Sequence, residues 1–463
     1  MLGLAREGLT LVRFMVGQGA QVTASDQKRS EDLREALAAL SGLPVRYSLG
    51  GHPLEILDAD ALFVSPGVPL DAPILVMARQ RGLRLSSESR LFSRLCPAPI
   101  VGITGSSGKT TTCTLVSKML EAGARRVHLG GNIGSPLLER LDEIKPTDIA
   151  VLELSSFQLD FFGPVLDAEP RAELGGVLFP PGGWSPPLAA VLNVTPNHLD
   201  RHPSMEAYAA AKAKIVRFQR PEDAAVLNWD DPVTRAYSAQ CPGRVRFFSL
   251  RERVPEGAYL RGDRLWLSWD GADDVPICAV SEVRLRGRHN VANVLAACAV
   301  SALLGISAED MANVARGFAG VEHRLELVRE WRGVRYYNDS IATSPERAMA
   351  ALDSFAEPIV LLAGGRDKHL PWGDWAELVA RKVVQVILFG EAAGLIEQAL
   401  KGLGQAMPPV RHAGSLAEAV QFASALARPG QVALFAPGGT SFDAFRDYEE
   451  RGRAFKALVS ALS

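Results

Sequence analysis

The chain has 463 residues, of which 47% are hydrophobic and 22% are charged, and its formal net charge is −2. This length exceeds what one hydrophobic core supports, so we expect a globular protein of roughly two to four domains. The balanced charge gives no indication of a nucleic-acid partner, and the lack of any run of about 18 apolar residues predicts that no segment inserts into a membrane.

The cysteines and the first residues bear on the compartment in which the protein works. Arg6 and Glu7 interrupt the first apolar stretch, so no signal peptide is expected. The cysteines are scattered without a CxxC pair and are expected to be free thiols: Cys96, Cys113, Cys241, Cys278 and Cys298. These features predict a cytoplasmic protein.

The first block of elements runs to about residue 97. A glycine-containing turn leads into the amphipathic segment GLTLVRFMVGQG, and the strand-like segment AQVTASD ends at Asp26. Strand, glycine turn, helix, strand and acid in this order are typical of a dinucleotide-binding fold, although a purely structural turn is equally compatible with the pattern. The strand that should precede Gly3 is almost absent. We therefore predict a Rossmann-like domain over residues 1–97 with a truncated first strand.

The second block begins near Ala98 and contains a phosphate-binding loop. The strand-like segment APIVGIT precedes GSSGKTT, at residues 105–111, and a helical segment follows. Glycines let the backbone approach phosphate oxygens, and the helix N-terminus directs N–H groups toward them. Lys109 is expected to reach the terminal phosphates and the Thr110 hydroxyl to bind Mg²⁺. The loop that we predict to bind a nucleotide consists of Gly105, Ser106, Ser107, Gly108, Lys109, Thr110 and Thr111.

Further polar candidates follow in the same block. The strand DIAVLEL ends at Glu153, and an acid at that end of a strand beside a phosphate loop commonly holds Mg²⁺. Another strand ends in a polar cluster with His198, and the alanine-rich helix after it carries Lys212, for which a solvated helix face is the simplest interpretation. Asn290 and Asn293 share one face of a later helix, where they either cap the helix or recognise the edge of a base.

The third block covers residues 321–463. The segment EPIVLLAGGRDKH is predicted to be a buried strand that runs into a glycine loop, and QVALFAPGGTSF repeats the pattern. Because strand, glycine turn and helix recur here, we expect another small doubly wound domain. The charged residues of the last helix are expected to form a solvated face: Asp447, Glu449, Glu450, Arg451 and Arg453.

The motifs occur in the order and spacing of a known family. The chain resembles the Mur ligases over nearly its whole length, in the segments GITGSSGKTTT, ELSSFQL, NVTPNHLDRH, AYAAAKAKI, GRHNVANVLAA, EHRLE, YNDSIATSPE, LLAGGRDK and SFDAFRDYEERG. The pieces SSFQL and SFDAF…YEERG resemble the D-glutamate-adding members in particular. The resemblance implies three α/β domains, with Rossmann-like domains at residues 1–97 and 321–463 and a central P-loop ATPase-like domain at residues 98–320.

The resemblance also implies a division of labour and a reaction. The first block holds the UDP end of a nucleotide-sugar substrate, the second binds ATP and two Mg²⁺ ions, and the third brings the amino acid. A carboxylate of UDP-N-acetylmuramoyl-L-alanine attacks the γ-phosphate of ATP, and the amine of D-glutamate attacks the resulting acyl phosphate. This places the protein, as a monomer, in the cytoplasmic synthesis of peptidoglycan precursors.

Positions that match the family's motifs receive their roles from the resemblance alone. Catalysis and Mg²⁺ binding fall to Lys109, Thr110, Glu153, His198 and Lys212, the last as a carbamylated lysine that helps hold the second Mg²⁺. ATP contacts beyond the phosphate loop fall to Asn290, Asn293, Arg324 and Asp339. The UDP-sugar substrate is expected at Asp26, in the uracil pocket, and at Asn132. D-Glutamate is expected at Thr343, Lys368, Ser441, Phe442 and Tyr448.

Some positions depart from the family's pattern, and two other functions stay open. Ile341 stands where many relatives have a lysine near the reacting end, so that contact is lost or supplied by another residue. Ser107 replaces the usual asparagine of the loop, and residues 163–187, which are rich in glycine and proline, predict a surface loop without a counterpart in shorter relatives. The alternatives are a Mur-type ligase for another amino acid and a non-catalytic nucleotide-binding protein, against which the full set of lysines and acids argues.

Overall fold

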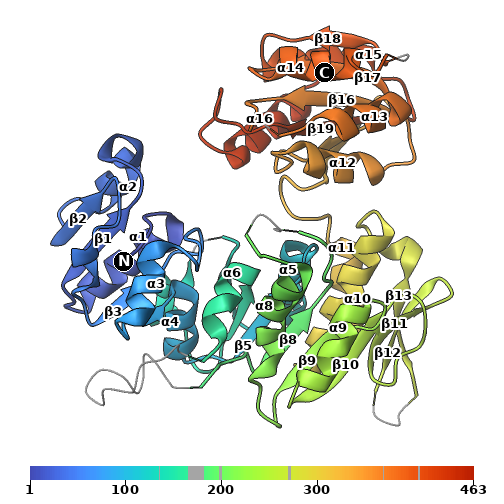
Figure 1. Ribbon diagram of the computed structural model, residues 1–463. Coiled ribbons are helices and arrows are strands. Elements are labelled where there is room, and N and C mark those ends of the chain that lie inside the picture. The colour runs from blue at the N-terminus through green and yellow to red at the C-terminus, as the bar shows by residue number, and fades with distance from the viewer. Residues whose placement is uncertain (135, 165–181, 198–200, 270–272, 369, 405–406) are drawn as a thin grey trace. The chain divides into compact units, whose positions relative to one another are not determined.

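A computed structural model describes residues 1–463 except 135, 165–181, 198–200, 270–272, 369 and 405–406 (Figure 1). The chain forms two compact units: Met1–Arg284 with Arg288–Gly317, and Leu285–Gly287 with Phe318–Ser463. Among the described helices, none combines the length and the apolar character needed to cross a bilayer. Both units consist of parallel or mixed sheets with helices, which confirms the predicted fold class.

The N-terminal part of the first unit contains two small sheets, in which β1 pairs with β2 and β3 with β4 in parallel. Its elements are α1 (Arg6–Gly17), β1 (Val22–Asp26), η1 (Ser30–Leu33), α2 (Arg34–Ala39), β2 (Val45–Leu49), η2 (Leu54–Leu57), β3 (Ala61–Phe63), α3 (Pro73–Gln80), β4 (Arg84–Ser86) and α4 (Glu88–Leu95). Leu2 is fully buried and forms isolated parallel bridges to Ser25 and Val64. The strand expected before Gly3 therefore consists of a single residue, which links the two sheets.

The rest of the first unit is built on a nine-stranded sheet with the order β13-β12-β11-β10-β9-β8-β5-β7-β6. Its strands are β5 (Ile100–Thr104), β6 (Val127–Gly131), β7 (Ile149–Glu153), β8 (Leu188–Val191), β9 (Ala224–Asn228), β10 (Arg244–Ser249), β11 (Gly257–Arg261), β12 (Arg264–Ser268) and β13 (Val275–Ala279). Strands β5 to β11 pair in parallel, whereas β12 pairs antiparallel with both of its neighbours, β11 and β13. Because β5 lies between β7 and β8, the loop that follows it begins inside the sheet and not at an edge.

The helical elements of this part of the chain lie between and after the strands of the nine-stranded sheet. They are α5 (Lys109–Ala122), η3 (Leu137–Glu143), α6 (Ser156–Leu159), η4 (Asp160–Phe162), α8 (Met205–Arg217), α9 (Pro232–Ala236), η5 (Tyr237–Gln240), η6 (Val280–Glu282), α10 (Arg288–Leu303) and α11 (Ala308–Gly317). Ser204 caps α8 by accepting a hydrogen bond from the backbone of Ala207, as the sequence predicts for a serine before a helix.

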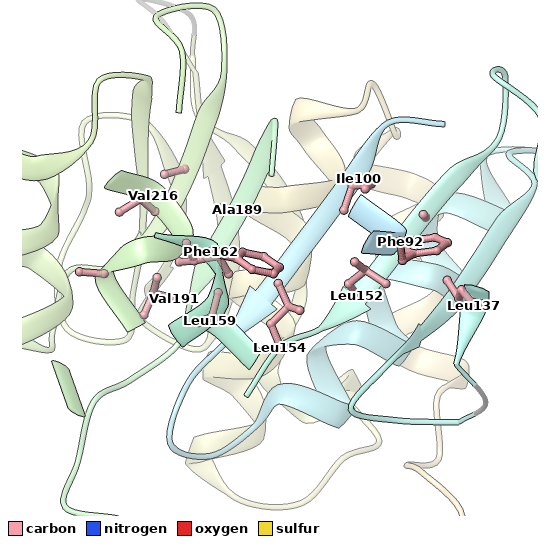
Figure 2. Close-up of a cluster of buried hydrophobic side chains, with 14 of the residues drawn as sticks. Phe92, Ile100, Leu137, Leu152, Leu154, Leu159, Phe162, Ala189, Val191 and Val216 are labelled. Carbon is pink, nitrogen blue, oxygen red and sulfur yellow. The ribbon is translucent and has the colours of Figure 1, made fainter. Parts of the chain in front are cut away.

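One hydrophobic cluster joins the N-terminal part to the central sheet, as Figure 2 shows. Phe92 of α4 and Leu137 of η3 belong to the same buried cluster as Ile100 of β5 and Leu152 of β7. Each such side chain stabilises the fold by about 1.5–3 kcal/mol when it leaves water. The strand that leads into the phosphate loop is therefore held in place by side chains from both parts.

Buried polar side chains connect the same two parts. The Glu7 carboxylate of α1 accepts a hydrogen bond of 2.8 Å from Gln158 Nε2 of α6, and Arg90 of α4 donates to the carbonyl oxygen of Phe161. Burial raises the pKa of Glu7 to about 7, although the charge of Arg6 opposes the shift. The glutamine of the SSFQL motif thus serves, in this chain, as a contact to the N-terminal helix.

The second unit is a six-stranded sheet with the order β14-β15-β19-β16-β17-β18, parallel except for β14. Its elements are β14 (Glu326–Trp331), β15 (Val334–Asn338), α12 (Pro345–Asp353), β16 (Ile359–Gly364), α13 (Gly373–Lys382), β17 (Val383–Phe389), α14 (Ala393–Lys401), β18 (Val410–His412), α15 (Leu416–Leu426), β19 (Val432–Gly438) and α16 (Tyr448–Ser460). Leu361 and Ala363 of β16 share a core with α12, α13 and α14, whereas Val360 and Leu362 share one with α15 and α16. Since alternate residues of a strand face opposite sides, helices cover both faces, as predicted for a doubly wound domain.

The short segment Leu285–Gly287 belongs to this second unit although α10 of the first unit follows it directly. Arg286 Nη1 lies 2.6 Å from Glu357 Oε1, and Arg335 Nη2 lies 2.5 Å from the same oxygen. The guanidinium carbon of Arg286 also lies 5.4 Å from the centre of the Tyr337 ring. The second unit is thus assembled from two separate stretches of chain that a shared carboxylate joins.

Arg451 corrects the prediction that the last helix carries only a solvated charged face. Its side chain is fully buried, whereas Arg453, two residues later, is exposed. The guanidinium donates to the carbonyl oxygens of Ser340, Gly439 and Thr440 at 2.9–3.1 Å and to the Ser340 hydroxyl. Burial lowers the pKa of Arg451 to about 10. Arg451 therefore ties the segments after β15 and β19 to the start of α16.

We expect Arg451→Met to destabilise the second unit by about 3 kcal/mol, because the buried carbonyl groups lose their donors. Arg453→Met, on the exposed side of the same helix, is the matched control and should change the free energy of unfolding by less than about 0.5 kcal/mol. Denaturant unfolding followed by tryptophan fluorescence measures both changes. Equal stability of the two variants would contradict the role given to Arg451.

Candidate active site

The phosphate loop connects buried strand β5 to α5 and requires a glycine at its end. Gly108 has φ = 81°, and a β-carbon at this position would lie 2.3 Å from Asn293 Oδ1. Asn293 in turn donates from Nδ2 to Asn290 Oδ1 at 3.0 Å. The fold therefore brings the two asparagines of α10, which the sequence singles out, directly against the phosphate loop.

Two lysines gather at the carbonyl oxygen of Gly105. Lys109 Nζ donates to it at 3.0 Å, and Lys212 Nζ donates to it at 3.1 Å and to Thr104 Oγ1 at 3.3 Å. The Lys212 side chain is 1% exposed, so its interpretation as part of a solvated helix face is wrong. Burial, reinforced by the charge of Lys109, holds the pKa of Lys212 well below its usual value, and Glu153 opposes this shift.

Glu153 provides the negative charge of the same site. It ends β7 with its side chain 3% exposed. Its Oε2 accepts a hydrogen bond from Thr110 Oγ1 at 2.8 Å, and its Oε1 accepts one from Asn132 Nδ2 at 2.9 Å. Thr110 and Asn132, chosen from separate motifs, thus meet at the carboxylate of Glu153.

The oxygen atoms at this point suit a magnesium ion. Mg²⁺ is typically bound through one or two carboxylates together with substrate phosphates and water, and rarely by a cage made only of protein. The pair formed by Thr110 and Glu153 supplies a hydroxyl and a carboxylate, and no group of three or more His, Cys, Asp or Glu side chains able to hold a metal occurs among the described residues. His198, the other predicted ligand, lies outside the described residues.

Asn193 fixes the serines of the phosphate loop and was not singled out from the sequence. Its Oδ1 accepts a hydrogen bond of 2.8 Å from the backbone N–H of Ser107, and its Nδ2 donates to the Ser107 carbonyl at 3.2 Å. The Ser106 hydroxyl lies 3.0 Å from the hydroxyl of Tyr208. The position of Asn193, two residues after the end of β8, is the signal that would have identified it, since polar residues that follow neighbouring parallel strands meet at one edge. Thr111, the last residue of the predicted loop, is buried.

The carboxylate of Asp26, the candidate in the N-terminal part, accepts hydrogen bonds from backbone N–H groups. Oδ2 accepts a hydrogen bond from the Leu4 N–H at 2.8 Å, and Oδ1 accepts one from the Lys28 N–H at 2.9 Å. Close to Asn132, Arg6 of α1 donates to the carbonyl oxygens of Gly131 and Gly134. Asp26 therefore shapes the glycine turn at the start of α1, and Asn132 lies on the loop that this helix faces.

In the second unit the candidates gather after three adjacent parallel strands. Asp339 and Thr343 follow β15, Lys368 follows β16, and Ser441 follows β19, which pairs with both. Carboxyl ends of parallel strands are the usual place for ligands in such a sheet. Lys368 Nζ lies 3.4 Å from Thr343 Oγ1, so these two predicted D-glutamate contacts are within reach of each other.

Charge and exposure differ among the remaining candidates of this unit. Burial raises the pKa of Asp339 to about 6, while a hydrogen bond from the Leu325 N–H and the charges of Arg324 and Arg347 oppose the shift. Ser441 is 2% exposed, whereas Phe442 is 61% exposed.

Arg324 lies in a tight turn. Its two neighbours in the chain, His323 and Leu325, both have positive φ, which is uncommon for residues other than glycine and often marks turns at functional positions.

Tyr448, at the start of α16, makes a side-chain contact. Its hydroxyl donates to Glu449 Oε1 at 3.3 Å.

Comparison with known proteins identifies the family. Residues 1–87 match the Mur ligase MurD-like N-terminal domain, residues 103–174 and 182–301 the Mur ligase middle domain, and residues 323–439 the Mur ligase glutamate ligase domain. The chain therefore belongs to the Mur ligase family. The MurD-like match of its N-terminal part sets it in one branch of that family.

Relatives and solved structures agree with this placement. A protein of Symbiobacterium thermophilum is 45% identical over 100% of this chain and 98% of its own length, and one of Acetivibrio thermocellus is 40% identical over 100% and 96%. Both are named UDP-N-acetylmuramoylalanine–D-glutamate ligase. UDP-N-acetylmuramate-alanine ligase of Thermotoga maritima is 18% identical with a TM-score of 0.57, covering 99% of this chain and 98% of its own. A pseudomurein peptide ligase of Methanothermus fervidus is 17% identical with a TM-score of 0.55, covering 100% and 99%; these two share the fold.

We expect Gly108→Ala to weaken ATP binding by roughly tenfold or more, because the positive φ alone costs an alanine about 1–2 kcal/mol and its methyl group would displace Asn293. Gly17→Ala is the control, since a β-carbon at that helical position meets nothing within 4 Å. The rise of the unfolding temperature with added ATP measures binding for both variants. An unchanged rise in Gly108→Ala would show that the loop does not bind the nucleotide.

Proposed function

We propose that the chain catalyses the ATP-dependent addition of D-glutamate to UDP-N-acetylmuramoyl-L-alanine in the synthesis of peptidoglycan precursors. The observation that carries this proposal is the convergence of Lys109, Thr110, Glu153 and Lys212 around one phosphate loop. The D-glutamate specificity is supported by the names of the relatives that match the chain over its whole length. A Mur-type ligase for another amino acid is the alternative, and a screen of amino acids for stimulated ADP release separates the two.

The reaction needs alignment and neutralisation of charge more than covalent catalysis by the protein. The substrate carboxylate attacks the γ-phosphorus of ATP, and ADP leaves from an acyl phosphate. The amine of D-glutamate then attacks the acyl carbon, loses a proton, and the tetrahedral intermediate collapses to an amide and inorganic phosphate. Lys109 and the N–H groups at the start of α5 hold the phosphates, and Asn290 and Asn293 contact the nucleotide from α10.

Thr110, Glu153 and His198 are the residues that would hold Mg²⁺, which supplies positive charge at the phosphates when bound. Lys212 is proposed to act as a carbamate that serves a second Mg²⁺. Its neutral amine adds to CO₂, forming an N–C bond and releasing one proton, so that an uncharged group beside Lys109 becomes an anion. The burial of Lys212 among uncharged oxygens favours the neutral amine that this step requires.

The other proposed contacts follow the division of the chain into three blocks, one for each substrate. Asp26 and Asn132 receive the UDP-sugar substrate, Arg324 and Asp339 contact ATP, and D-glutamate is bound by Thr343, Lys368, Ser441, Phe442 and Tyr448. The enzyme is proposed to act as a cytoplasmic monomer.

The test of this function is release of phosphate that requires all three substrates together with Mg²⁺. Lys109→Ala should lower the rate roughly 100-fold, since a cation at the γ-phosphate in a dry site stabilises the transition state by about 3 kcal/mol. Lys118→Ala, at an exposed position of the same helix, is the control. Phosphate release that does not require D-glutamate would contradict the proposed specificity, and a near-normal rate in Lys109→Ala would contradict the assignment of the loop.

Lys212→Arg and Lys212→Ala should both lose most activity while still folding and binding ATP. Arginine keeps its positive charge and provides no carbamate oxygen, so the conservative change should be no better than the deletion. Labelling with ¹³C-bicarbonate should give a carbamate signal in the wild type that is missing from both variants. Lys214→Arg, in the same helix and paired with Asp160, should keep the label. An active Lys212→Arg enzyme would refute the carbamate.

A further inference from the structure

The nucleotide-sugar substrate carries negative charge on its diphosphate, and the two residues assigned to this substrate provide no positive charge. Asp26 is an acid and Asn132 is neutral. In UDP-N-acetylmuramoyl-L-alanine the diphosphate lies between the uridine, assigned to Asp26, and the sugar, assigned to Asn132. A cationic partner for the diphosphate is therefore expected between these two residues.

Arg6, the first residue of α1, is bonded to the loop that carries the sugar contact. Its Nη1 donates to the carbonyl oxygen of Gly134 at 2.6 Å, and its Nη2 donates to that of Gly131 at 3.3 Å, on either side of Asn132. Asn132 itself donates to Glu153 from its backbone N–H at 2.8 Å and from Nδ2 at 2.9 Å. The guanidinium thus lies against a loop that is fixed from both sides.

The glycine turn before Arg6 connects it to the uridine contact. The N–H of Gly3 donates to the carbonyl oxygen of Ser25 at 2.8 Å. The N–H of Leu4 donates to the carboxylate of Asp26, also at 2.8 Å. These two N–H groups of the turn are therefore already used within the protein. Since Arg6 follows Leu4 by two residues, hydrogen bonds and a short stretch of chain place it between the uridine contact and the sugar contact.

The charge of Arg6 is available to a ligand. The residue is exposed, and it forms no ion pair with any residue that the structure describes. The carboxylate of Glu7, the next residue, is buried and accepts a hydrogen bond from Gln158. A guanidinium has five N–H donors, so the bonds to Gly131 and Gly134 leave donors for phosphate oxygens.

We propose that Arg6 is a substrate-binding residue whose guanidinium binds the diphosphate of UDP-N-acetylmuramoyl-L-alanine. A guanidinium matches phosphate oxygens with paired donors. Because Gly131 and Gly134 already hold this side chain, little of its conformational freedom is lost when the substrate binds. This inference rests on the proposed function, because it assumes that the UDP-sugar is the substrate.

The experiment measures the affinity of the full chain for UDP-N-acetylmuramoyl-L-alanine and for UDP by isothermal titration calorimetry. Arg6→Ala should weaken both by roughly 10- to 100-fold, as expected for loss of a charge-assisted hydrogen bond, and leave the affinity for ATP within about twofold. Arg13→Ala is the matched control and should change none of these values, since Arg13 lies on the same helix and pairs with Glu139 at the surface.

Two further variants separate the charge of Arg6 from its contact with the loop. Arg6→Lys keeps the charge without the paired donors and should bind with an affinity between those of the wild type and Arg6→Ala. Arg6→Gln can still donate to a loop carbonyl but is uncharged, so it should bind as weakly as Arg6→Ala. Added salt should weaken substrate binding more steeply in the wild type than in Arg6→Gln, because screening acts on the charge. Since Arg6 is exposed, the unfolding temperature of the ligand-free variants should equal that of the wild type.

The outcomes distinguish this inference from the proposed function. If Arg6→Gln binds as tightly as the wild type, Arg6 only positions the loop and the inference is wrong. If Arg6→Ala binds UDP normally, the arginine does not hold the diphosphate and the inference is again wrong, whereas the proposed function stands. A lower unfolding temperature or an equal loss of ATP affinity in Arg6→Ala would show a structural role and overturn the inference. If the wild type binds neither UDP nor UDP-N-acetylmuramoyl-L-alanine, the proposed function itself fails, and the inference fails with it.

Discussion

The carbonyl oxygen of Gly105, which accepts hydrogen bonds from both Lys109 and Lys212, is the point on which the architecture of the first unit depends. Burial and the charge of Lys109 both lower the pKa of Lys212 at this oxygen, and the carboxylate of Glu153 opposes that shift. The carbonyl follows β5, which lies inside the sheet, and Lys212 reaches it from α8 with a buried side chain.

The sequence predicted those parts of the site that are formed by residues close together in the chain. A strand, a glycine loop and a helix N-terminus make a phosphate site from neighbouring residues, and Glu153 is identified by the end of its own strand. The residues around Lys212 alone favoured a solvated helix face, and only the family resemblance favoured a modified lysine, since the face that a helix presents to the core is decided by the elements packed against it. The same reason explains Arg451, which looks solvated among four charged neighbours and is fully buried. The strand expected before Gly3 is also explained by packing between elements. Leu2 alone takes its place by pairing with both small sheets.

Buried polar groups join separate stretches of the chain in both units. Gln158 donates to Glu7 between the N-terminal helix and the central sheet, and Arg451 holds the segments after two strands through their carbonyl groups. An apolar contact tolerates sliding, whereas a buried hydrogen bond is costly to leave unmade, so each of these contacts fixes one relative position. The candidate ligand-binding loops lie directly beside these fixed points.

The assembly of the second unit from two stretches of chain bears on how this protein is divided for engineering. Leu285–Gly287 contributes Arg286 to the carboxylate of Glu357 and to the face of Tyr337, yet α10 and α11 of the first unit separate it in the chain from Phe318. A fragment that starts at Phe318 keeps Arg335 as a partner of Glu357 and leaves the Tyr337 ring without its covering guanidinium. This unit therefore has no single boundary in the chain. Exchanging the unit between homologues requires moving Leu285–Gly287 together with Phe318–Ser463.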